Sequence, residues 1–180
     1  MRIISGTYKG RRITAPKNLP VRPTTDMAKE ALFNILNNLY YFDSIMVLDL
    51  FAGTGNISYE FASRGVENIL AVDENYKCIK FINETAESFD MPISTIRSDV
   101  FKFLANYSTK IDVIFADPPY NFTIDQFSEL PELVFANELL AEDGLLVIEH
   151  SKHTDLAHLK HFKQSKSYGG NSFSFFKVLV

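Results

Sequence analysis

The sequence predicts one α/β domain in which a mostly parallel β-sheet is covered by helices on both faces. Apolar runs at 45–51, 69–73, 111–116 and 145–149 alternate with helix-like stretches. These runs are nearly continuous, which indicates strands that are buried on both faces. The chain has 180 residues and a hydrophobic fraction of 46%, which is enough for one globular core. Together these observations predict a βαβ arrangement of parallel strands.

Charge is distributed unevenly along the chain. The net charge is −4, but residues 1–25 hold six Lys or Arg and no acid, so 26–180 holds the other 12 basic and all 22 acidic residues. The first segment is therefore +6 and the second −10. We expect 1–25 to form a basic arm with a connector and 26–180 to form the domain body. Such an arm can steer a polyanion, and the alternative is a solvated hairpin without a partner.

The N-terminal segment is expected to be extended as far as a first helix. Turns near Gly6 and Gly10 separate short apolar stretches, which predicts a hairpin over 1–14. Three prolines within 15–25 disfavour helix and predict an extended connector. Asp26 is the expected N-cap of a helix, because apolar residues then recur at helical spacing: Met27, Ala31, Leu32, Ile35, Leu36 and Leu39.

The later elements continue the pattern and end in a hairpin. A helix is expected over 75–89 and a weaker strand over 93–98. Residues 172–180 look like the second strand of a hairpin that begins near 160–167, so the sheet should end in an antiparallel element. The aromatic residues of this tail are expected to pack in the core and edge strand: Phe173, Phe175 and Phe176.

The strongest local signal is the segment VLDLFAGTG at 47–55, a buried strand that runs into a Gly-x-Gly turn and opens a helix. Gly53 and Gly55 allow a ligand to approach the backbone beyond the strand end. A dinucleotide fingerprint needs a third glycine where this chain has Ser58, and Asp49 would repel a diphosphate. Asp49 can instead pair with an ammonium group, which favours S-adenosylmethionine over a nicotinamide dinucleotide.

Two more carboxylates follow later strands. Asp73 ends the next strand, 20 residues after Gly53, where it can accept hydrogen bonds from ribose hydroxyls. Asp99 follows the weaker strand and can meet an adenine amino group while Val100 offers its main-chain N–H. Asp99 can equally serve as the N-cap of a helix over 100–106, and the two roles are compatible.

The tetrapeptide Asp117-Pro118-Pro119-Tyr120 directly follows the run 111–116. An exocyclic base amine is a poor nucleophile, so an enzyme that methylates it must aim the nitrogen lone pair at the methyl donor. Asp117 and the Pro118 carbonyl can each accept one amine hydrogen, and Pro119 stiffens the turn. Tyr120 offers a face for an extruded base, a contact worth about 1–3 kcal/mol. The alternative is a rigid surface turn without chemistry.

Composition narrows the class of protein further. Cys78 is the only cysteine, which excludes an internal disulfide and a cysteine-rich zinc site and is typical of a cytoplasmic protein. The start MRIISG lacks a signal-peptide pattern, and no apolar run reaches a membrane-spanning length. No metal is expected, because no carboxylate or thiolate completes a site with the histidines, which we interpret as a surface cluster: His150, His153, His158 and His161. Without heptads or an apolar surface stripe, a monomer is expected.

Five segments carry a resemblance to a known family: MRIISGTYKGRRI at 1–13, RPTTDMAKEALFNIL at 22–36, DLFAGTG at 49–55, DPPY at 117–120 and SYGGNSFSFF at 167–176. In these segments, and over nearly its whole length, the chain resembles the bacterial small-subunit ribosomal RNA guanine-N2 methyltransferases of the D type, within the class I Rossmann-like methyltransferases. The resemblance implies a seven-stranded sheet with a reversed last strand. It also implies methylation of one guanine in 16S rRNA, within the small ribosomal subunit.

The resemblance also implies roles for particular residues. The cofactor S-adenosylmethionine would contact Asp49, Phe51, Gly53, Gly55, Asp73, Asp99 and Asp117, and we include their neighbours Asn56, Glu74 and Val100. Family members commonly have a small residue where this chain has Asn56, which leaves the pocket shape near the methionine moiety open. The catalytic loop would be Asp117, Pro118, Pro119 and Tyr120. RNA would meet the arm and the segment after it, at Arg2, Lys9, Arg11, Arg12, Arg22 and Thr24.

Three other functions fit parts of the pattern. A DNA adenine-N6 methyltransferase could use the same tetrapeptide, but only the residues before 45 lie outside the sheet region, too few for a target-recognition domain. A nicotinamide-linked oxidoreductase could use the same type of core and would bind NADH in preference to S-adenosylhomocysteine. A non-catalytic RNA-binding protein would keep the basic arm and bind the cofactor weakly.

Overall fold

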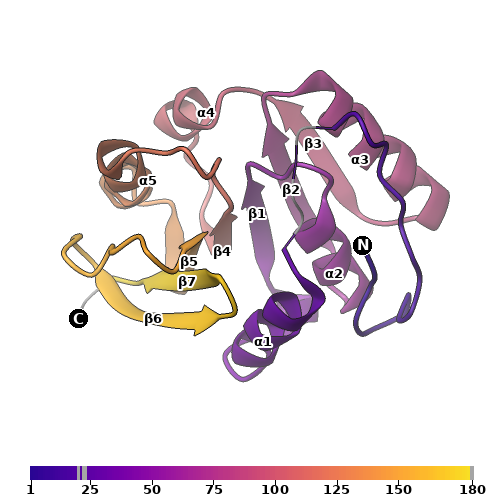
Figure 1. Ribbon diagram of the computed structural model, residues 1–180, viewed down its shortest axis with the longest axis horizontal. Helices are drawn as coiled ribbons and strands as arrows, with labels where there is room; N and C mark the ends of the chain where they lie inside the picture. Colours follow the sequence, from indigo (N-terminus) through magenta and orange to yellow (C-terminus); the bar gives the residue numbers. More distant parts are fainter. Residues whose placement is uncertain (20, 22–23, 179–180) are drawn as a thin grey trace.

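The computed structural model describes residues 1–19, 21 and 24–178, and its centre is a seven-stranded sheet (Figure 1). The strand order is β3-β2-β1-β4-β5-β7-β6. All neighbours from β3 to β5 are parallel, and β7 is antiparallel to both β5 and β6. The predicted sheet with a reversed last strand is therefore confirmed. The strands are β1 (Met46–Leu50), β2 (Asn68–Asp73), β3 (Ile93–Arg97), β4 (Ile111–Ala116), β5 (Leu140–Ser151), β6 (Phe162–Tyr168) and β7 (Asn171–Phe176).

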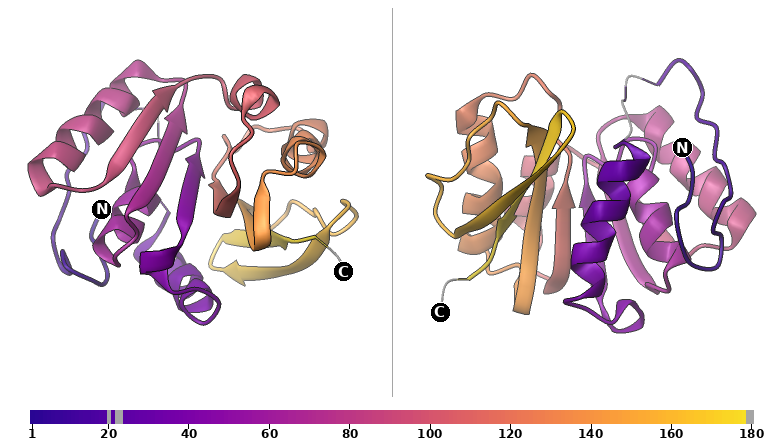
Figure 2. Two further views of the ribbon diagram at one scale, coloured as in Figure 1. Left: turned by 180° about the vertical axis from the view of Figure 1, so that it is seen from behind. Right: turned by 60° about the horizontal axis from the view of Figure 1, so that its bottom comes forward.

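Helices cover both faces of the sheet, as predicted (Figure 2). Three helices pack in one core cluster with one face of the sheet, and two pack in a second cluster with the other face. The first group is α1 (Asp26–Asn37), α2 (Asn56–Ser63) and α3 (Tyr76–Phe89), and the second is α4 (Val100–Asn106) and α5 (Ile124–Ala136). A 3-10 turn, Phe42–Ser44, precedes β1. None of the helices among the described residues is long and apolar enough to span a membrane.

Several element boundaries differ from the sequence-based expectation; the last strand, for example, is Asn171–Phe176 where 172–180 was expected, and two further differences have a clear local reason. The N-cap of α1 is Thr25, whose hydroxyl accepts from the Ala28 amide, so Asp26 is already the first helical residue. A threonine hydroxyl can also accept the capping hydrogen bond, although aspartate is the stronger N-cap residue. Strand β5 starts at Leu140, five residues before the apolar run at 145–149. The sequence did not reveal this early start, because the exposed acids Glu142 and Asp143 interrupt the apolar pattern of the strand.

The N-terminal arm forms a hairpin with a single β-bridge, between Arg2 and Arg12. The Ile3 amide donates to the Arg11 carbonyl at 2.9 Å, and Ile3 and Ile13 are buried in the same core cluster as α1 and α2. Gly6 lies so close to α2 that an added Cβ would be 1.8 Å from the Ser63 carbonyl oxygen. The arm is thus packed on the domain body.

A buried carboxylate of α2 holds this arm in place. Glu60 is fully buried, and its two oxygens accept hydrogen bonds from the main-chain amides of Ile4 and Ser5 at 2.9 and 3.0 Å. Arg64 donates to Glu60 at 2.9 Å, and the buried ammonium of Lys29 lies 3.5 Å from it. Burial lowers the pKa of Lys29, and the nearby Glu60 opposes that shift. The arm, α1 and α2 therefore share one buried ionic network.

Candidate active site

The glycine turn after β1 has the backbone conformation that the sequence predicts. Gly53 and Gly55 have φ angles of +55° and +82°, in the left-handed region that glycine tolerates. A Cβ on Gly55 would lie 2.7 Å from the ring of Tyr59, so a larger residue would displace that ring. Phe51 also has a positive φ, +56°, which is strained for a bulky residue. Strain of this kind is typical of ligand-binding turns.

Asp49 lies beneath this turn and is almost completely buried, 1% exposed. The hydroxyl of Ser58 donates to its carboxylate at 2.6 Å. The residue that replaces the third glycine of a dinucleotide fingerprint therefore supports the acid. Burial raises the pKa of Asp49 to about 7, with a smaller contribution from Asp73, while the Ser58 hydrogen bonds oppose the shift. A cation beside Asp49 would favour its charged form.

The raised pKa of Asp49 predicts a pH-dependent stability. The carboxyl pKa is about 7 in the folded protein and about 3.9 in an unfolded chain. Its contribution is therefore fully present below about pH 4 and is lost as pH rises towards 7. Asp49→Asn should be more stable than the wild type at pH 8 and closer to it at pH 5, as urea unfolding would measure. An equal difference at both pH values would contradict the assignment.

The carboxylates of Asp73, the last residue of β2, and Asp99, which follows β3, accept hydrogen bonds from nearby main-chain amides. Asp73 accepts from the Gly53 amide and from the Asn75 amide, each at 2.8 Å, so it links β2 to the glycine turn. Asp99 caps α4 by accepting from the Lys102 amide at 2.9 Å, which confirms the capping interpretation. Each carboxylate oxygen can accept a second hydrogen bond, so both residues remain able to bind a ligand. Glu74 is exposed, and Val100 is buried as the first residue of α4.

An aromatic wall of Phe51, Phe101 and Phe122 stands beside the turn, and the sequence analysis selected only Phe51 of the three. The rings of Phe101 and Phe122 are stacked with centroids 5.9 Å apart. Phe51 contacts Phe101 and Phe122 edge-on, with centroids 6.4 and 5.4 Å away. Phe101 follows Asp99 by two residues and Phe122 follows Tyr120 by two, so both are close in sequence to predicted site residues. This wall suits a flat heterocycle.

The tetrapeptide at the end of β4 lies directly beside the glycine turn. Strands β1 and β4 are neighbours, and the Asp117 amide donates to the Leu50 carbonyl at 3.3 Å. Pro118 is buried, Pro119 is exposed, and the side chain of Tyr120 is fully exposed to solvent. Burial and the nearby carboxylates Glu149 and Asp49 raise the pKa of Asp117. The predicted juxtaposition of the two motifs is therefore present, at the carboxyl edge of the sheet (Figure 1).

Glu149 near the end of β5 is a site residue that the sequence analysis did not select. It is 3% exposed, and burial raises its pKa. Thr24 donates to one of its oxygens at 2.6 Å and Asn171 to the other at 2.7 Å. Thr24 was predicted to face RNA, but it is buried against this acid. The sequence signal that could have identified Glu149 is its position as an acid at the end of the apolar run 145–149.

Asn56, predicted to contact the cofactor, is buried and faces the connector, whereas most basic residues of the arm are exposed. The Asn56 side chain accepts from Lys29 at 2.8 Å and donates to the Thr24 carbonyl at 3.1 Å, so it faces the connector. Arg2 pairs with Asp26 at 3.2 Å, and Arg11 lies over the Phe89 ring. The other basic side chains of the arm with described positions are exposed: Lys9, Arg12 and Lys17. Arg22 lies outside the described residues.

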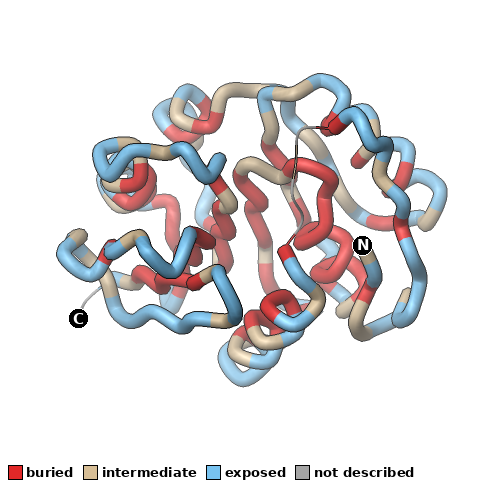
Figure 3. Tube along the Cα trace, in the orientation of Figure 1, coloured by how far each residue is buried: buried red, intermediate tan, exposed pale blue. Residues whose placement is uncertain are grey.

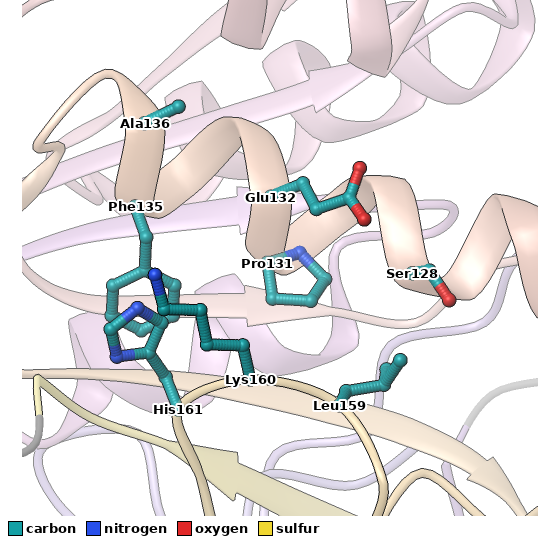
Figure 4. Close-up of a pocket in the computed structure, with 8 residues that line it drawn as sticks. All are labelled: Ser128, Pro131, Glu132, Phe135, Ala136, Leu159, Lys160 and His161. Atoms are coloured by element: carbon teal, nitrogen blue, oxygen red, sulfur yellow. The ribbon is translucent and has the colours of Figure 1, made fainter.

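The expected surface cluster of four histidines is only partly present, because His153 and His158 are exposed but His150 is buried. His150 is buried, with its ring nitrogens bonded to the Ser151 carbonyl at 2.8 Å and to the Ser174 hydroxyl at 2.7 Å. His161 stacks on Phe135 with centroids 4.0 Å apart, at a pocket between α5 and the segment before β6 (Figure 4). In the described part of the chain, no three His, Cys, Asp or Glu side chains are grouped as a metal site.

Comparison with known protein families finds a match over almost the whole chain. The model of the family Conserved hypothetical protein 95 matches residues 1–177. The chain belongs to this family. The family match includes the arm, the glycine turn, the tetrapeptide and the final hairpin.

Proteins that are similar in sequence to this member of the Conserved hypothetical protein 95 family are named as methyltransferases. The Bacillus subtilis protein named "Putative rRNA methyltransferase YlbH" is 36% identical over 161 residues, which is 87% of this chain and 85% of that one. Ribosomal RNA small subunit methyltransferase D of Escherichia coli K12 is 29% identical over 83% of this chain and 74% of its own. A solved Escherichia coli structure, "Putative methyltransferase yhhF", is 26% identical and superposes with a TM-score of 0.85 over 98% of this chain and 96% of that one.

Proposed function

We propose that this protein methylates the exocyclic N2 amine of a guanine in 16S rRNA, using S-adenosylmethionine. The observation that carries the proposal is the contact between the two predicted motifs, in which the Asp117 amide bonds to the Leu50 carbonyl. It brings a ligand-binding turn next to a turn that can hold an amine. The names of the relatives, which specify rRNA and the small subunit, support the choice of substrate.

The residues beside the glycine turn fit S-adenosylmethionine. The buried Asp49 carboxylate can pair with the amino-acid ammonium, and such a cation would favour the charged form of Asp49 against the effect of burial. The free lone pairs of Asp73 suit ribose hydroxyls, and the wall of Phe51, Phe101 and Phe122 suits adenine. The cofactor supplies an electrophilic methyl group on a positively charged sulfur.

The catalytic loop positions the amine. The Asp117 carboxylate and the Pro118 carbonyl each accept one amine hydrogen, which leaves the nitrogen lone pair free to face the methyl group. Asp117 also stabilises the positive charge that develops on nitrogen as the new bond forms. Tyr120, fully exposed at the tip of the loop, stacks on the extruded base. No protein base is needed, because the methylated amine loses its proton readily.

The substrate is expected to reach the site as part of the small ribosomal subunit, with the protein acting as a monomer in the cytoplasm. The exposed basic residues of the arm would contact RNA phosphates beside the acidic domain body. Cys78, the one cysteine of the chain, is buried and free, as suits a reducing compartment.

The arm gives a prediction about salt dependence. Replacing both Lys9 and Arg12 with glutamine should weaken binding to small-subunit particles. It should also make the slope of log affinity against log salt concentration shallower, because a protein that contacts fewer phosphates releases fewer counterions on binding. Lys77 and Lys80 on α3, replaced in the same way, serve as the control. Titrations at several salt concentrations would measure the slope, and an unchanged slope in the arm variant would exclude these residues from the interface.

The proposed function is tested by nucleoside mass spectrometry of 16S rRNA. Cells without this gene should lose one N2-methylguanosine, the wild-type gene should restore it, and an Asp117→Ala gene should not. An unchanged nucleoside profile would defeat the assignment of the substrate. Loss of N6-methyladenosine from DNA instead would favour the adenine methyltransferase alternative.

A further inference from the structure

Glu149 is a buried carboxylate that the mechanism above does not use. Strands β4 and β5 pair in parallel with Ala116 opposite Ile148, so the next residues lie side by side, Asp117 directly after β4 and Glu149 two residues before the end of β5. Adjacent strands lie about 4.8 Å apart. The electrostatic effect of Glu149 on Asp117 agrees with this short separation. The half-buried carboxylate that holds the amine therefore has a buried acid next to it.

These acids face the same side of the sheet. Phe115 and Val147 are paired neighbours and belong to the core cluster that contains α1 and α2. Side chains alternate along a strand, so Asp117 and Glu149, two residues further on, point to that same side. Asp49, which pairs with Phe115 from β1, does so as well. A base held at Asp117 on this side would have Glu149 at its edge.

The carboxylate of Glu149 has a fixed direction. Thr24, from the connector before α1, and Asn171, at the start of β7, each donate to a different oxygen, at 2.6 and 2.7 Å. A carboxylate oxygen can accept two hydrogen bonds, so each oxygen keeps one position free. The two donors thus orient the group without using up its capacity.

A purely structural role does not explain the charge. A neutral glutamine could bridge Thr24 and Asn171 equally well, since a threonine hydroxyl can accept as well as donate. A carboxylate at this position instead raises the pKa of Asp117 and so disfavours its charged form. Unfavourable placement of like charges is typical of functional sites, where a ligand compensates it. The compensating ligand here must bring hydrogen-bond donors.

We propose that Glu149 selects guanine by accepting the hydrogen of its ring nitrogen N1 while Asp117 and Pro118 hold the adjacent N2 amine. Guanine presents N1–H and the N2 amine side by side, whereas adenine has an acceptor at N1. A fixed carboxylate attracts the first edge and repels the second. A site built to bond a donor discriminates strongly against a base that lacks it, because its polar group is left unpaired. This proposal rests on the proposed function and adds to it the residue that distinguishes guanine from other bases.

The test compares guanine with 2-aminopurine, which has the same 2-amine but an acceptor at N1. Small-subunit particles carrying either base at the target position are methylated by the wild type and by Glu149→Gln, and kcat/KM is measured for each. The wild type should prefer guanine at least 100-fold. In Glu149→Gln, whose amide N–H can donate to N1, the preference should fall at least 10-fold. Glu142→Gln, at the exposed beginning of β5, should keep the wild-type preference.

Each outcome decides between the alternatives. If Glu149→Gln keeps the wild-type preference for guanine, whether both rates are unchanged or both fall by the same factor, Glu149 does not recognise the base and the proposal is wrong. Should that variant fail to fold, Glu149→Asp, which keeps the charge, must retain the preference for guanine at a lower kcat/KM, and loss of the preference would overturn the proposal. If the wild type leaves the guanine particle unmethylated, the proposed function itself fails and the role of Glu149 falls with it.

Discussion

Asp117→Asn is expected to lower the rate of methyl transfer about 100- to 1,000-fold, a larger change than in the affinity for the cofactor, which Asp117 contacts as one residue among several. Removal of one preorganised charge that stabilises a transition state costs on this order. The asparagine oxygen still accepts one amine hydrogen but does not balance the positive charge on nitrogen. A single-turnover assay with methyl-labelled S-adenosylmethionine measures the rate, and calorimetry with S-adenosylhomocysteine measures binding.

The same substitution should make the free protein more stable at pH 8. The pKa of Asp117 is raised in the folded state, so its stabilising contribution is present below the unfolded-state pKa and is lost as pH rises through the folded value. Asparagine has no ionisable proton in this pH range, so the variant does not lose stability at this position as pH rises. Asp112→Asn, at the opposite end of β4, is the matched control and should retain wild-type activity. A variant that is both active and less stable at pH 8 would refute the role given to Asp117.

Glu60→Ala should lower the free energy of unfolding by about 3–5 kcal/mol, the typical cost of removing one partner of a buried ion pair. The buried Lys29 would lose its counter-charge, and the amides of Ile4 and Ser5 would lose their acceptor. Deprotonation of Lys29, whose pKa burial already lowers, limits the cost to the lower part of this range. Chemical denaturation measures the change, and limited proteolysis should then cut the arm faster.

An exposed ion pair provides the control for Glu60. Glu84 and Lys80 lie 3.7 Å apart on α3, with side chains 62% and 59% exposed. Glu84→Ala should change stability by no more than about 0.5 kcal/mol, as is usual for exposed pairs within a helix. A loss below about 1 kcal/mol in Glu60→Ala would mean that the arm is held by apolar packing of Ile3 and Ile13 instead.

The sheet and the two motifs were predictable because their signals are local. Strands that are buried on both faces must be apolar along their whole length, so β1, β2, β4 and the later part of β5 could be recognised from composition alone. Gly53 and Gly55 follow β1 within a few residues, and Asp117 follows β4 directly. Since parallel strands end at one edge of the sheet, their proximity followed from the topology.

Features that depend on distant segments could not be predicted. Thr24 and Glu149 are 125 residues apart, and only the folded chain shows that they bond. Lys29 and Glu60 carry charges that normally indicate an exposed helix face, yet both are buried because they satisfy each other and the arm. His150 was assigned to the surface for the same reason, since a polar residue in the sequence does not reveal its buried partner Ser174.

Figure 3 shows that the backbone is buried along most of the central strands β1 and β4, after which the glycine turn and the catalytic loop follow. A crystal structure with bound S-adenosylhomocysteine tests the meeting point of these two segments directly. We expect the amino-acid ammonium beside Asp49, the adenine against Phe101 and Phe122, and the sulfur directed at the space next to Asp117 and Pro118. A ligand bound elsewhere, or a sulfur that faces away from Asp117, would contradict the account.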